Sequence, residues 1–292
     1  MIDSAEPEFR RTSLKIVSPA PASIFQVTAD SVWPAISFAI EGELPYGQQL
    51  TWDWQIQWRK FSKKGTVITT TNSWDAREAL QGLGGALTVS VSGAGEKASI
   101  SLYIAGTNPE AADIFSYLAT RPESAGFEKI LQHETQMSHF DAKGQPRASF
   151  DSGFGMCQLT NPAPSFEQCW NWKLNLDAGL ALYAAKRTAA MRYLSQNGRS
   201  FTPDQLIRET IARWNGGAYH VWNSAQKTWI RNPAVLCDSK TGNIGWDLTH
   251  PDNRGKNEAA LHQRDAAKYR HAPGANDCWG YFGICYADRL LS

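Results

Sequence analysis

The spacing of apolar residues changes once along this chain, near residue 106, and that change constrains the possible folds more than any other feature. Before it, six short runs alternate apolar or β-branched residues with polar ones, and Gly, Pro or Asn lies between the runs. The run LTWDWQIQW is the clearest, because every second residue from Leu50 to Trp58 is apolar. We therefore predict an immunoglobulin-like β-sandwich over residues 21–106, preceded by a leader or linker at residues 1–20.

Residues 107–292 follow helical spacing and are predicted to form a second, mainly α domain. One helix is expected to begin with Ser124 as its N-cap. The segment TPDQLIRETIARWNGG predicts another, because Thr202 and Gln205 can form a capping box around Pro203 at the first helical position. NLDAGLALYAAKRTAAMRYL and the final DCWGYFGICYADRLLS predict two more, with a polar, loop-rich stretch before the last. The expected fold class is α+β.

Charge and apolar run length argue against two classes of partner. The 292 residues carry a formal net charge of +1, whereas nucleic-acid-binding proteins carry a clear basic excess. No stretch approaches the roughly 20 apolar residues of a membrane helix, so membrane insertion is not expected. The first residues contain no apolar core of a secretory signal. We expect a protein made in the cytoplasm and exported by a dedicated system.

The chain has five cysteines, so at least one is left without a disulfide partner. Cys278 and Cys285 can pair with each other or with Cys237, and the sequence leaves these alternatives open. No C-x-x-C pair occurs, which argues against a zinc ribbon or a redox motif.

The segment LQHETQMSH places a glutamate beside two histidines and raises the question of a metal site. A zinc-peptidase helix needs H-E-x-x-H, whose histidines lie four residues apart on one helix face. His133 and His139 are six residues apart, which is about 600° around a helix and puts them on well-separated faces. The metal interpretation therefore fails, and we expect neither a metal nor a cofactor.

Glu134 in this segment lies on the helix stripe that should face the core. Phe127, Ile130 and Leu131 precede it by seven, four and three residues. Burial and the negative end of the helix dipole both favour the protonated carboxyl, as a general acid requires. The alternative is a helix-end glutamate that faces solvent or pairs with a neighbouring basic residue.

Three motifs follow Glu134 in a fixed order: GFGMCQL from Gly153, NLDAG from Asn175 and ARWNGG from Ala212, with YADRLL near the C-terminus. This order resembles the lysozyme-like superfamily that holds soluble lytic transglycosylases and goose-type lysozymes. Members of that superfamily carry a catalytic Glu at a helix end, then G-x-G-[LM]-M-Q-[LV], N-[IV]-x-x-G and A-x-Y-N-x-G. The resemblance covers roughly residues 120–291.

The resemblance implies a muramidase that cleaves the β-1,4 bond between N-acetylmuramic acid and N-acetylglucosamine in peptidoglycan. Glu134 would protonate the glycosidic oxygen, and Tyr286 would hydrogen-bond or orient this acid. Asn215 fits a helix C-cap as well as a site residue. The residues that the resemblance assigns to substrate binding are Ser152, Gly155, Met156, Gln158, Trp214, Asn215 and Tyr286. The sequence departs from the family pattern at Cys157, where Met is frequent, and at Trp214, where Tyr is frequent.

A hydrolase of this kind needs a second carboxylate to position water, whereas a lytic transglycosylase uses the substrate's own 6-hydroxyl. Goose-type enzymes keep an Asp where this chain has Thr160. Asp151 is our first choice for the water-positioning residue and Asp141 the second, with a local turn as the alternative for each. Hydrolysis is the first prediction, and transglycosylase activity remains the alternative.

Two other classes of function fit parts of this sequence. Cys157 with His133 or His139 as base would suggest a cysteine peptidase, but a buried hydrophobic cysteine is preferred. A lysozyme-like domain can also bind cell wall without cutting it, or form a structural part of a phage tail or secretion spike.

A wall hydrolase without a signal peptide, with a sandwich before its catalytic region, resembles an antibacterial type VI secretion effector or a phage tail lysin. By this analogy the partners are glycan strands of peptidoglycan, an immunity protein and a secretion-spike component, and the site of action is the periplasm of a target bacterium.

Overall fold

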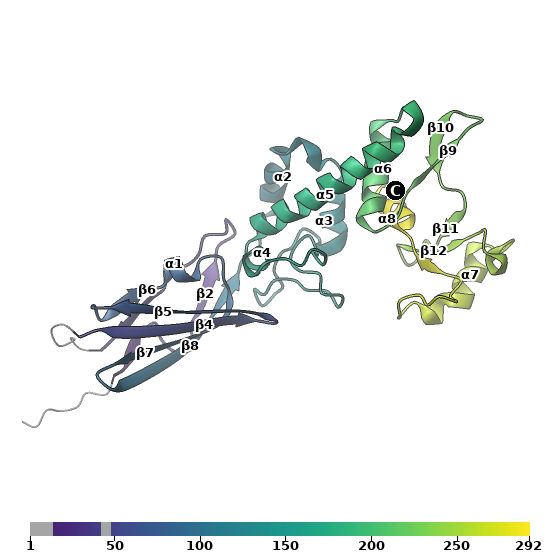
Figure 1. Ribbon diagram of the computed structural model, residues 1–292. Helices are drawn as coiled ribbons and strands as arrows, with labels where there is room; N and C mark the ends of the chain where they lie inside the picture. The colour runs from purple at the N-terminus through teal and green to yellow at the C-terminus, as the bar shows by residue number, and fades with distance from the viewer. Residues whose placement is uncertain (1–13, 42–47) are drawn as a thin grey trace, which may run out of the picture. The chain divides into compact units, whose positions relative to one another are not determined.

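The computed structural model describes residues 14–41 and 48–292, so most of the predicted leader at residues 1–20 lies outside the described residues. The described chain is mixed α+β, with several sheets and helices (Figure 1). No helix in the described part of the chain is long and apolar enough to cross a bilayer.

Contacts divide the chain into two compact units. The first comprises the residues up to Glu110 together with Ser138–Asn175, and the second comprises Ala111–Met137 together with Leu176–Ser292. The sequence had placed all of residues 107–292 in one domain, whereas these contacts group Ser138–Asn175 with the N-terminal strands.

Two sheets make up the N-terminal part of the first unit. One has the strand order β2-β8-β7-β4-β5 and the other the order β1-β3-β6 (Figure 1). The elements are β1 (Ile16–Ser18), β2 (Ile24–Val27), β3 (Ser37–Ile40), β4 (Leu50–Trp58), β5 (Phe61–Thr69), β6 (Ser73–Asp75), α1 (Arg77–Leu80), β7 (Gly85–Gly93) and β8 (Glu96–Gly106).

The six predicted runs correspond to β2, β3, β4, β5, β7 and β8, so the period-two pattern identified these strands. Two strands were not predicted. β1 and β6 have three residues each, too few to establish a period, and β1 lies inside the span assigned to the leader. β1 is held there because Ile16 is buried and pairs with Ile40 of β3.

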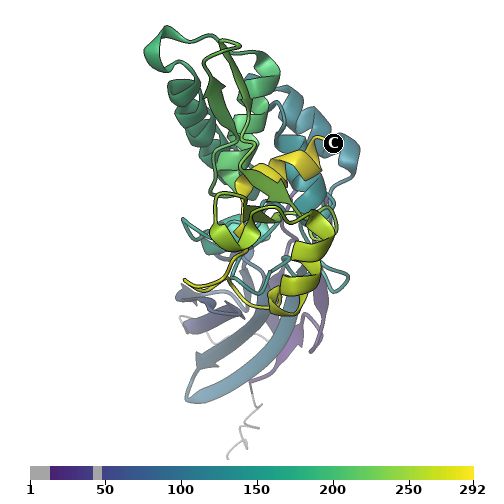
Figure 2. The same cartoon turned by 90° about the vertical axis from the view of Figure 1, so that its right-hand side faces the viewer.

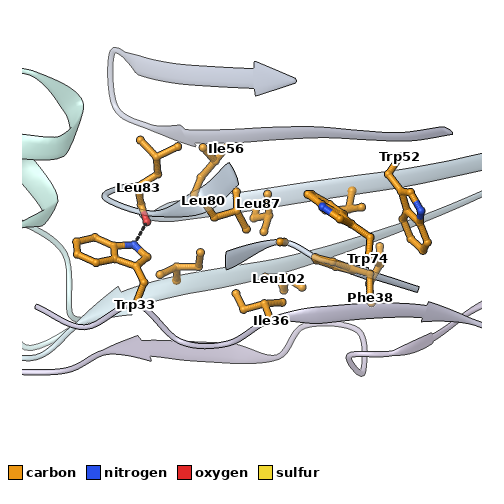
Figure 3. Packing of buried hydrophobic residues seen from close by; sticks show 14 of the residues in the cluster. Trp33, Ile36, Phe38, Trp52, Ile56, Trp74, Leu80, Leu83, Leu87 and Leu102 are labelled. Carbon is orange, nitrogen blue, oxygen red and sulfur yellow. Dashed lines mark hydrogen bonds between the residues drawn. The ribbon is translucent and has the colours of Figure 1, made fainter. Parts of the chain in front are cut away.

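Side chains from both sheets share one core (Figure 3). Phe38 of β3 stacks on Trp74 of β6 with ring centroids 5.4 Å apart, and Trp52 of β4 lies 6.1 Å from Trp74. The indole N–H of Trp33 donates to the carbonyl of Leu83 at 2.7 Å, which satisfies a polar group inside this core. Several of the chain's many tryptophans are therefore used for packing.

The segment Ser138–Asn175 packs against the same core. It contains α4 (Phe166–Trp170). The rings of Phe154 and Trp170 contact Trp58 edge-on at 5.6 and 5.9 Å. A Cβ atom on Gly106, at the end of β8, would lie 2.2 Å from the ring of Phe140, so glycine allows this close approach. Aromatic packing explains why this segment belongs to the first unit.

The second unit is mainly helical at its start and mixed further on. Its elements are α2 (Ala111–Ala119), η1 (Pro122–Ser124), α3 (Phe127–Thr135), most of α5 (Trp172–Leu194), η2 (Gln196–Gly198), α6 (Pro203–Trp214), β9 (His220–Asn223), β10 (Thr228–Arg231), β11 (Val235–Cys237), β12 (Ile244–Asp247), η3 (Pro251–Asn253), α7 (Glu258–Asp265), η4 (Ala266–Lys268), β13 (Gly280–Tyr281) and α8 (Gly283–Leu290). The C-terminal helix α8 packs against α6 and α3 (Figure 2).

One predicted N-cap is confirmed and one is wrong. Thr202 and Gln205 form the predicted capping box of α6. Ser124 is not an N-cap, because it lies in η1 and its hydroxyl donates to the carbonyl of Leu118. The N-cap of α3 is Gly126, whose φ of +89° suits a residue without a Cβ.

The stretch predicted as loops holds more regular structure than expected. β9 and β10 form an antiparallel hairpin, and β11 and β12 pair in a sheet whose third strand is β13. These strands have two to four residues each, and tertiary packing rather than sequence period fixes them. β13 lies in the segment predicted as the last helix, and that helix begins at Gly283 rather than near Asp277.

Candidate active site

Glu134 lies in the last turn of α3, as the sequence predicted. Phe127, Ile130 and Leu131 on the same helix are fully buried, and Glu134 is half-buried. The helix ends at Gln136, which has a left-handed φ of 55° and whose backbone N–H donates to carbonyls of the last turn. The carboxylate is therefore held at a rigid helix end.

Tyr286 of α8 contacts this carboxylate directly. Its hydroxyl donates to Glu134 Oε1 at 2.5 Å, and the tyrosine side chain is only 3% exposed. Burial, together with the charge and hydrogen bond of Glu134, raises the pKa of Tyr286 far above its usual value. The phenol therefore stays protonated and acts as a fixed donor to the glutamate. The ring of His133 lies edge-on to Tyr286 at 5.2 Å.

α8 is held in place by a disulfide next to Tyr286. Cys237 of β11 pairs with Cys285, which settles the alternatives that the sequence left open. One turn further, Asp288 accepts hydrogen bonds from Tyr219 at 2.5 Å and from Arg231 at 2.7 Å. These contacts fix the helix that positions Tyr286.

Two glycines allow α8 to begin against the end of α6. A Cβ on Gly283 would lie 2.1 Å from the carbonyl oxygen of Ala212, and a Cβ on Gly217 would lie 3.0 Å from the amide nitrogen of Gly283. Gly283 was not singled out from the sequence. The available signal was a pair of glycines, Gly280 and Gly283, inside a segment predicted as helix.

Trp214 and Asn215 both have structural roles at the end of α6. The ring of Trp214 contacts Phe127 at 5.5 Å and Tyr183 at 6.4 Å, which ties α6 to the start of α3. Asn215 is the C-cap of α6, followed by Gly216 with a φ of +84°. Substrate contact by either residue stays a prediction.

A buried carboxylate that the sequence did not indicate fixes the turn after α6. Glu209 is fully buried, and its Oε2 accepts from the backbone N–H groups of Tyr219 and His220 and contacts His220 Nδ1, each at 3.0 Å. Burial alone would raise the pKa of Glu209, but these hydrogen bonds and the charge of Arg213 keep it below its usual value. Glu209 is therefore a charged structural residue.

A cavity of about 420 Å³ lies in the second unit beside the start of α8. Its lining includes Gly216 and Gly217, the exposed ring of Tyr281 and the carboxylate of Asp247. Asp247 Oδ1 accepts from the backbone and hydroxyl of Thr249 at 2.8 and 2.7 Å.

The glycine segment at residues 153–159 belongs to the first unit and is held by two buried polar side chains. Asn175 Oδ1 accepts from the N–H of Cys157 at 3.0 Å, and its Nδ2 donates to the carbonyl of Phe154 at 3.1 Å. Gly155 has a φ of +74°, and a Cβ there would lie 2.5 Å from Asn175 Nδ2. Only glycine fits this position.

His139 is the second of these side chains. Its Nδ1 accepts from the N–H of Met156 at 3.0 Å, and its Nε2 contacts the carbonyl of Cys169 at 2.8 Å. These partners assign a neutral ring protonated on Nε2. Burial lowers the pKa of His139 to about 4. Both nitrogens are therefore engaged, and His139 cannot serve as a base for Cys157.

Met156 is fully buried in this segment, whereas Gln158 and the predicted residues that precede the segment reach the surface. Gln158 is half-buried, with its side-chain amide donating to the carbonyl of Gly155 at 2.7 Å. Asp151 and Ser152 are exposed, and Asp151 accepts a hydrogen bond from Ser149. Asp141 Oδ1 accepts from two backbone amides of its own turn, at 2.8 and 2.9 Å, which is the local-turn alternative considered for it.

The structure thus brings Glu134 and Tyr286 into contact within the second unit, with Trp214 and Asn215 in the same unit. The predicted residues between Asp151 and Gln158 belong to the first unit. Comparisons with protein-family models, with curated proteins and with solved structures find no match to this chain.

Proposed function

We propose that this protein is a peptidoglycan-cleaving muramidase, with an immunoglobulin-like β-sandwich followed by a lysozyme-like domain, and that Glu134 is its general acid. The observation that carries the proposal is the hydrogen bond from Tyr286 to Glu134. It joins, across 152 residues of sequence, the two positions that the motif order had assigned to an acid and to the residue that orients it.

The hydrogen bond also indicates which oxygen of Glu134 would deliver the proton. In a protonated carboxyl the carbonyl oxygen accepts hydrogen bonds and the other oxygen carries the proton. Tyr286 donates to Oε1, so Oε2 would carry the proton and face the glycosidic oxygen. Protonation of that oxygen would assist its departure as the sugar gains oxocarbenium character.

The principal test is the loss of turbidity of purified peptidoglycan. Glu134→Gln keeps the shape of the side chain but removes the acid, and it should slow clearing roughly 10²- to 10⁴-fold. Glu128→Gln is the matched control, because it removes one carboxylate from the same helix and should clear the suspension at the wild-type rate. Equal rates for Glu134→Gln and wild type would show that Glu134 is not the acid.

A wild-type protein that sediments with peptidoglycan without clearing it would be a wall-binding module instead. Capture of the protein by a small periplasmic protein encoded beside it would favour the antibacterial effector, with its immunity partner and delivery through a secretion spike, over the phage tail lysin.

The products distinguish the two reactions. Reducing ends in the released muropeptides would indicate hydrolysis, and 1,6-anhydro ends would indicate transglycosylation. Asp151 is the proposed water-positioning residue: it accepts one hydrogen bond from the hydroxyl of Ser149, whereas Asp141 accepts two from backbone amides of its own turn. If this is right, Asp151→Asn should slow the hydrolytic reaction and Asp141→Asn should not. Mass spectrometry of the products from each variant measures both effects.

A further inference from the structure

Three side chains with metal-binding atoms converge in the second unit, away from Glu134 in sequence. They are His250, Asp252 and Cys278, and their ligand atoms all lie within 4.8 Å of one another. The Cys278 thiol donates to Asp252 Oδ2 at 3.4 Å, and His250 Nδ1 lies 4.0 Å from the same oxygen. The cluster thus combines a thiol, an imidazole and a carboxylate from two separate segments.

A buried asparagine fixes these two segments relative to each other. Asn253 is fully buried, and its Nδ2 donates to the carbonyls of Cys278 and Asp247 at 2.9 and 2.8 Å. Its Oδ1 accepts from Arg264 at 2.8 Å. The fold itself therefore positions the backbone that carries the three side chains. Binding of a ligand would not have to pay the entropy cost of ordering that backbone.

Cys278 differs from the other cysteines outside the disulfide. Cys157 and Cys169 are buried in the first unit, whereas Cys278 reaches the surface in a chain that holds a disulfide elsewhere. A surface thiol in such a protein is open to oxidation. Coordination by a metal would replace its hydrogen bond to Asp252 and protect the sulfur.

The spacing of the ligand atoms is close to that of a tetrahedral zinc site. Bond lengths of about 2.3 Å to sulfur and about 2.0–2.2 Å to nitrogen and oxygen place sulfur and oxygen ligands roughly 3.6 Å apart, and nitrogen and oxygen ligands roughly 3.4 Å apart. The observed separations from Asp252 Oδ2 are 3.4 and 4.0 Å. Small rotations of exposed side chains would close the difference.

The groups around the cluster favour a thiolate-binding ion over Ca²⁺ or Mg²⁺. His250 Nδ1 accepts a hydrogen bond from the N–H of Asp252 at 3.2 Å, so this nitrogen is unprotonated, and a metal would replace that bond. Lys256 and Arg264 donate to the backbone carbonyl of Asp252 at 2.7 and 2.9 Å, so this oxygen is already engaged and does not add to the oxygen ligands at the cluster. Hard cations need several oxygen ligands, whereas sulfur and nitrogen ligands suit zinc.

We propose that His250, Asp252 and Cys278 bind one Zn²⁺ ion, with water in the fourth position. This site is independent of the muramidase proposal, because none of its ligands takes part in the Glu134 site.

Cobalt(II) titration of the full chain tests the proposal, because a cobalt–thiolate bond gives a charge-transfer band in the near ultraviolet. We expect the band to saturate at one equivalent of Co²⁺ and to disappear when Zn²⁺ is added. Cys278→Ser should abolish it. His250→Ala and Asp252→Asn should each weaken Co²⁺ binding at least tenfold. His271→Ala, which removes an exposed histidine outside the cluster, should leave the titration unchanged.

A wild-type protein without the band, or a band of equal strength in Cys278→Ser, would overturn the proposal. His250→Ala alters an exposed side chain, so it keeps the test decisive if Cys278→Ser fails to fold. Tryptophan fluorescence of each variant verifies folding before the titration.

Discussion

Glu134 and the glycine segment at residues 153–159 carry the two main parts of the predicted site, and the structure holds them by different contacts. Glu134 accepts a hydrogen bond from one side chain, that of Tyr286, at the end of a helix. The glycine segment is held through its backbone, by hydrogen bonds to the buried side chains of His139 and Asn175. The carboxylate of Glu134 thus stays partly accessible to solvent, whereas the side chains of His139 and Asn175 are fully used in holding the backbone.

This difference indicates how each part should respond to mutation. Substitutions around the glycine segment should lower stability, because they leave buried polar groups unsatisfied. Substitutions at the half-buried Glu134 should affect chemistry more than stability. Substitutions in α8 should affect both properties. A disulfide and packing hold this helix in place, and the hydroxyl of its Tyr286 contacts Glu134.

The largest expected effect is on the disulfide that holds α8, the helix whose Tyr286 contacts Glu134. Replacing Cys237 and Cys285 by Ala removes a cross-link that closes a loop of 48 residues, and this should lower the free energy of unfolding by about 4 kcal/mol. Urea unfolding followed by tryptophan fluorescence measures the change. Cys278→Ala, measured like the double variant in metal-free buffer with a chelator, is the control and should leave that free energy nearly unchanged. A loss under about 1 kcal/mol in the double variant would mean that the disulfide does little to hold α8.

Asn175→Ala tests the glycine segment. It removes the partners of two buried backbone groups, and the free energy of unfolding should fall by about 3 kcal/mol. Asn171→Ala is the matched control: its side chain caps the first turn of α5, and its loss should cost about 1 kcal/mol. If the two variants unfold at the same urea concentration, the buried contacts of Asn175 are not the main support of the segment.

His139 should make the stability of the protein depend on pH. An unfolded histidine takes up a proton below about pH 6.5, whereas His139 in the folded state does so only near its lowered pKa of about 4. The contribution of His139 to the free energy of unfolding is therefore fully present above pH 6.5. It is lost as the pH decreases towards 4, which lowers that free energy by up to roughly 3 kcal/mol. Urea unfolding at pH 7 and pH 4.5 measures the fall, and His139→Gln should reduce it. An equal pH dependence in both proteins would contradict this assignment.

Tyr286→Phe should have the smallest effect and the most specific one. If Glu134 is the acid of the proposed muramidase, loss of its hydrogen bond from Tyr286 should lower the rate of peptidoglycan cleavage about tenfold, or about 1.4 kcal/mol in activation free energy. Tyr219→Phe removes a comparable hydrogen bond to Asp288 on the same helix and should leave the rate nearly unchanged. Equal rates for the two variants would mean that Tyr286 supports α8 without orienting the acid.

Part of this structure could be predicted because its signals are local. The alternation from Leu50 to Trp58 identified β4, and the pair Thr202 and Gln205 identified the start of α6. The stripe that precedes Glu134 identified which face of α3 is buried. Each signal lies within one element, so neighbouring residues were sufficient.

The misassigned features depend on residues distant in sequence. Ser124 had the sequence character of an N-cap, but the chain turns at Gly126 instead, next to Tyr183 and Ile207. Short strands such as β9 and β12 show no period of their own and form by pairing with other strands. The roles of Glu209 and Gly283 likewise follow from contacts that no local pattern records.

The sequence by itself determined the strands with long alternating runs, the capped start of α6 and the position of Glu134 at a helix end, because these depend on side chains a few residues apart. Only the tertiary structure decided that Cys285 pairs with Cys237, that the segment around Gly155 packs with the N-terminal sheets, and that the hydroxyl of Tyr286 reaches Glu134. Those outcomes require the chain to be folded back on itself, because which distant groups meet is set by the packing of whole elements.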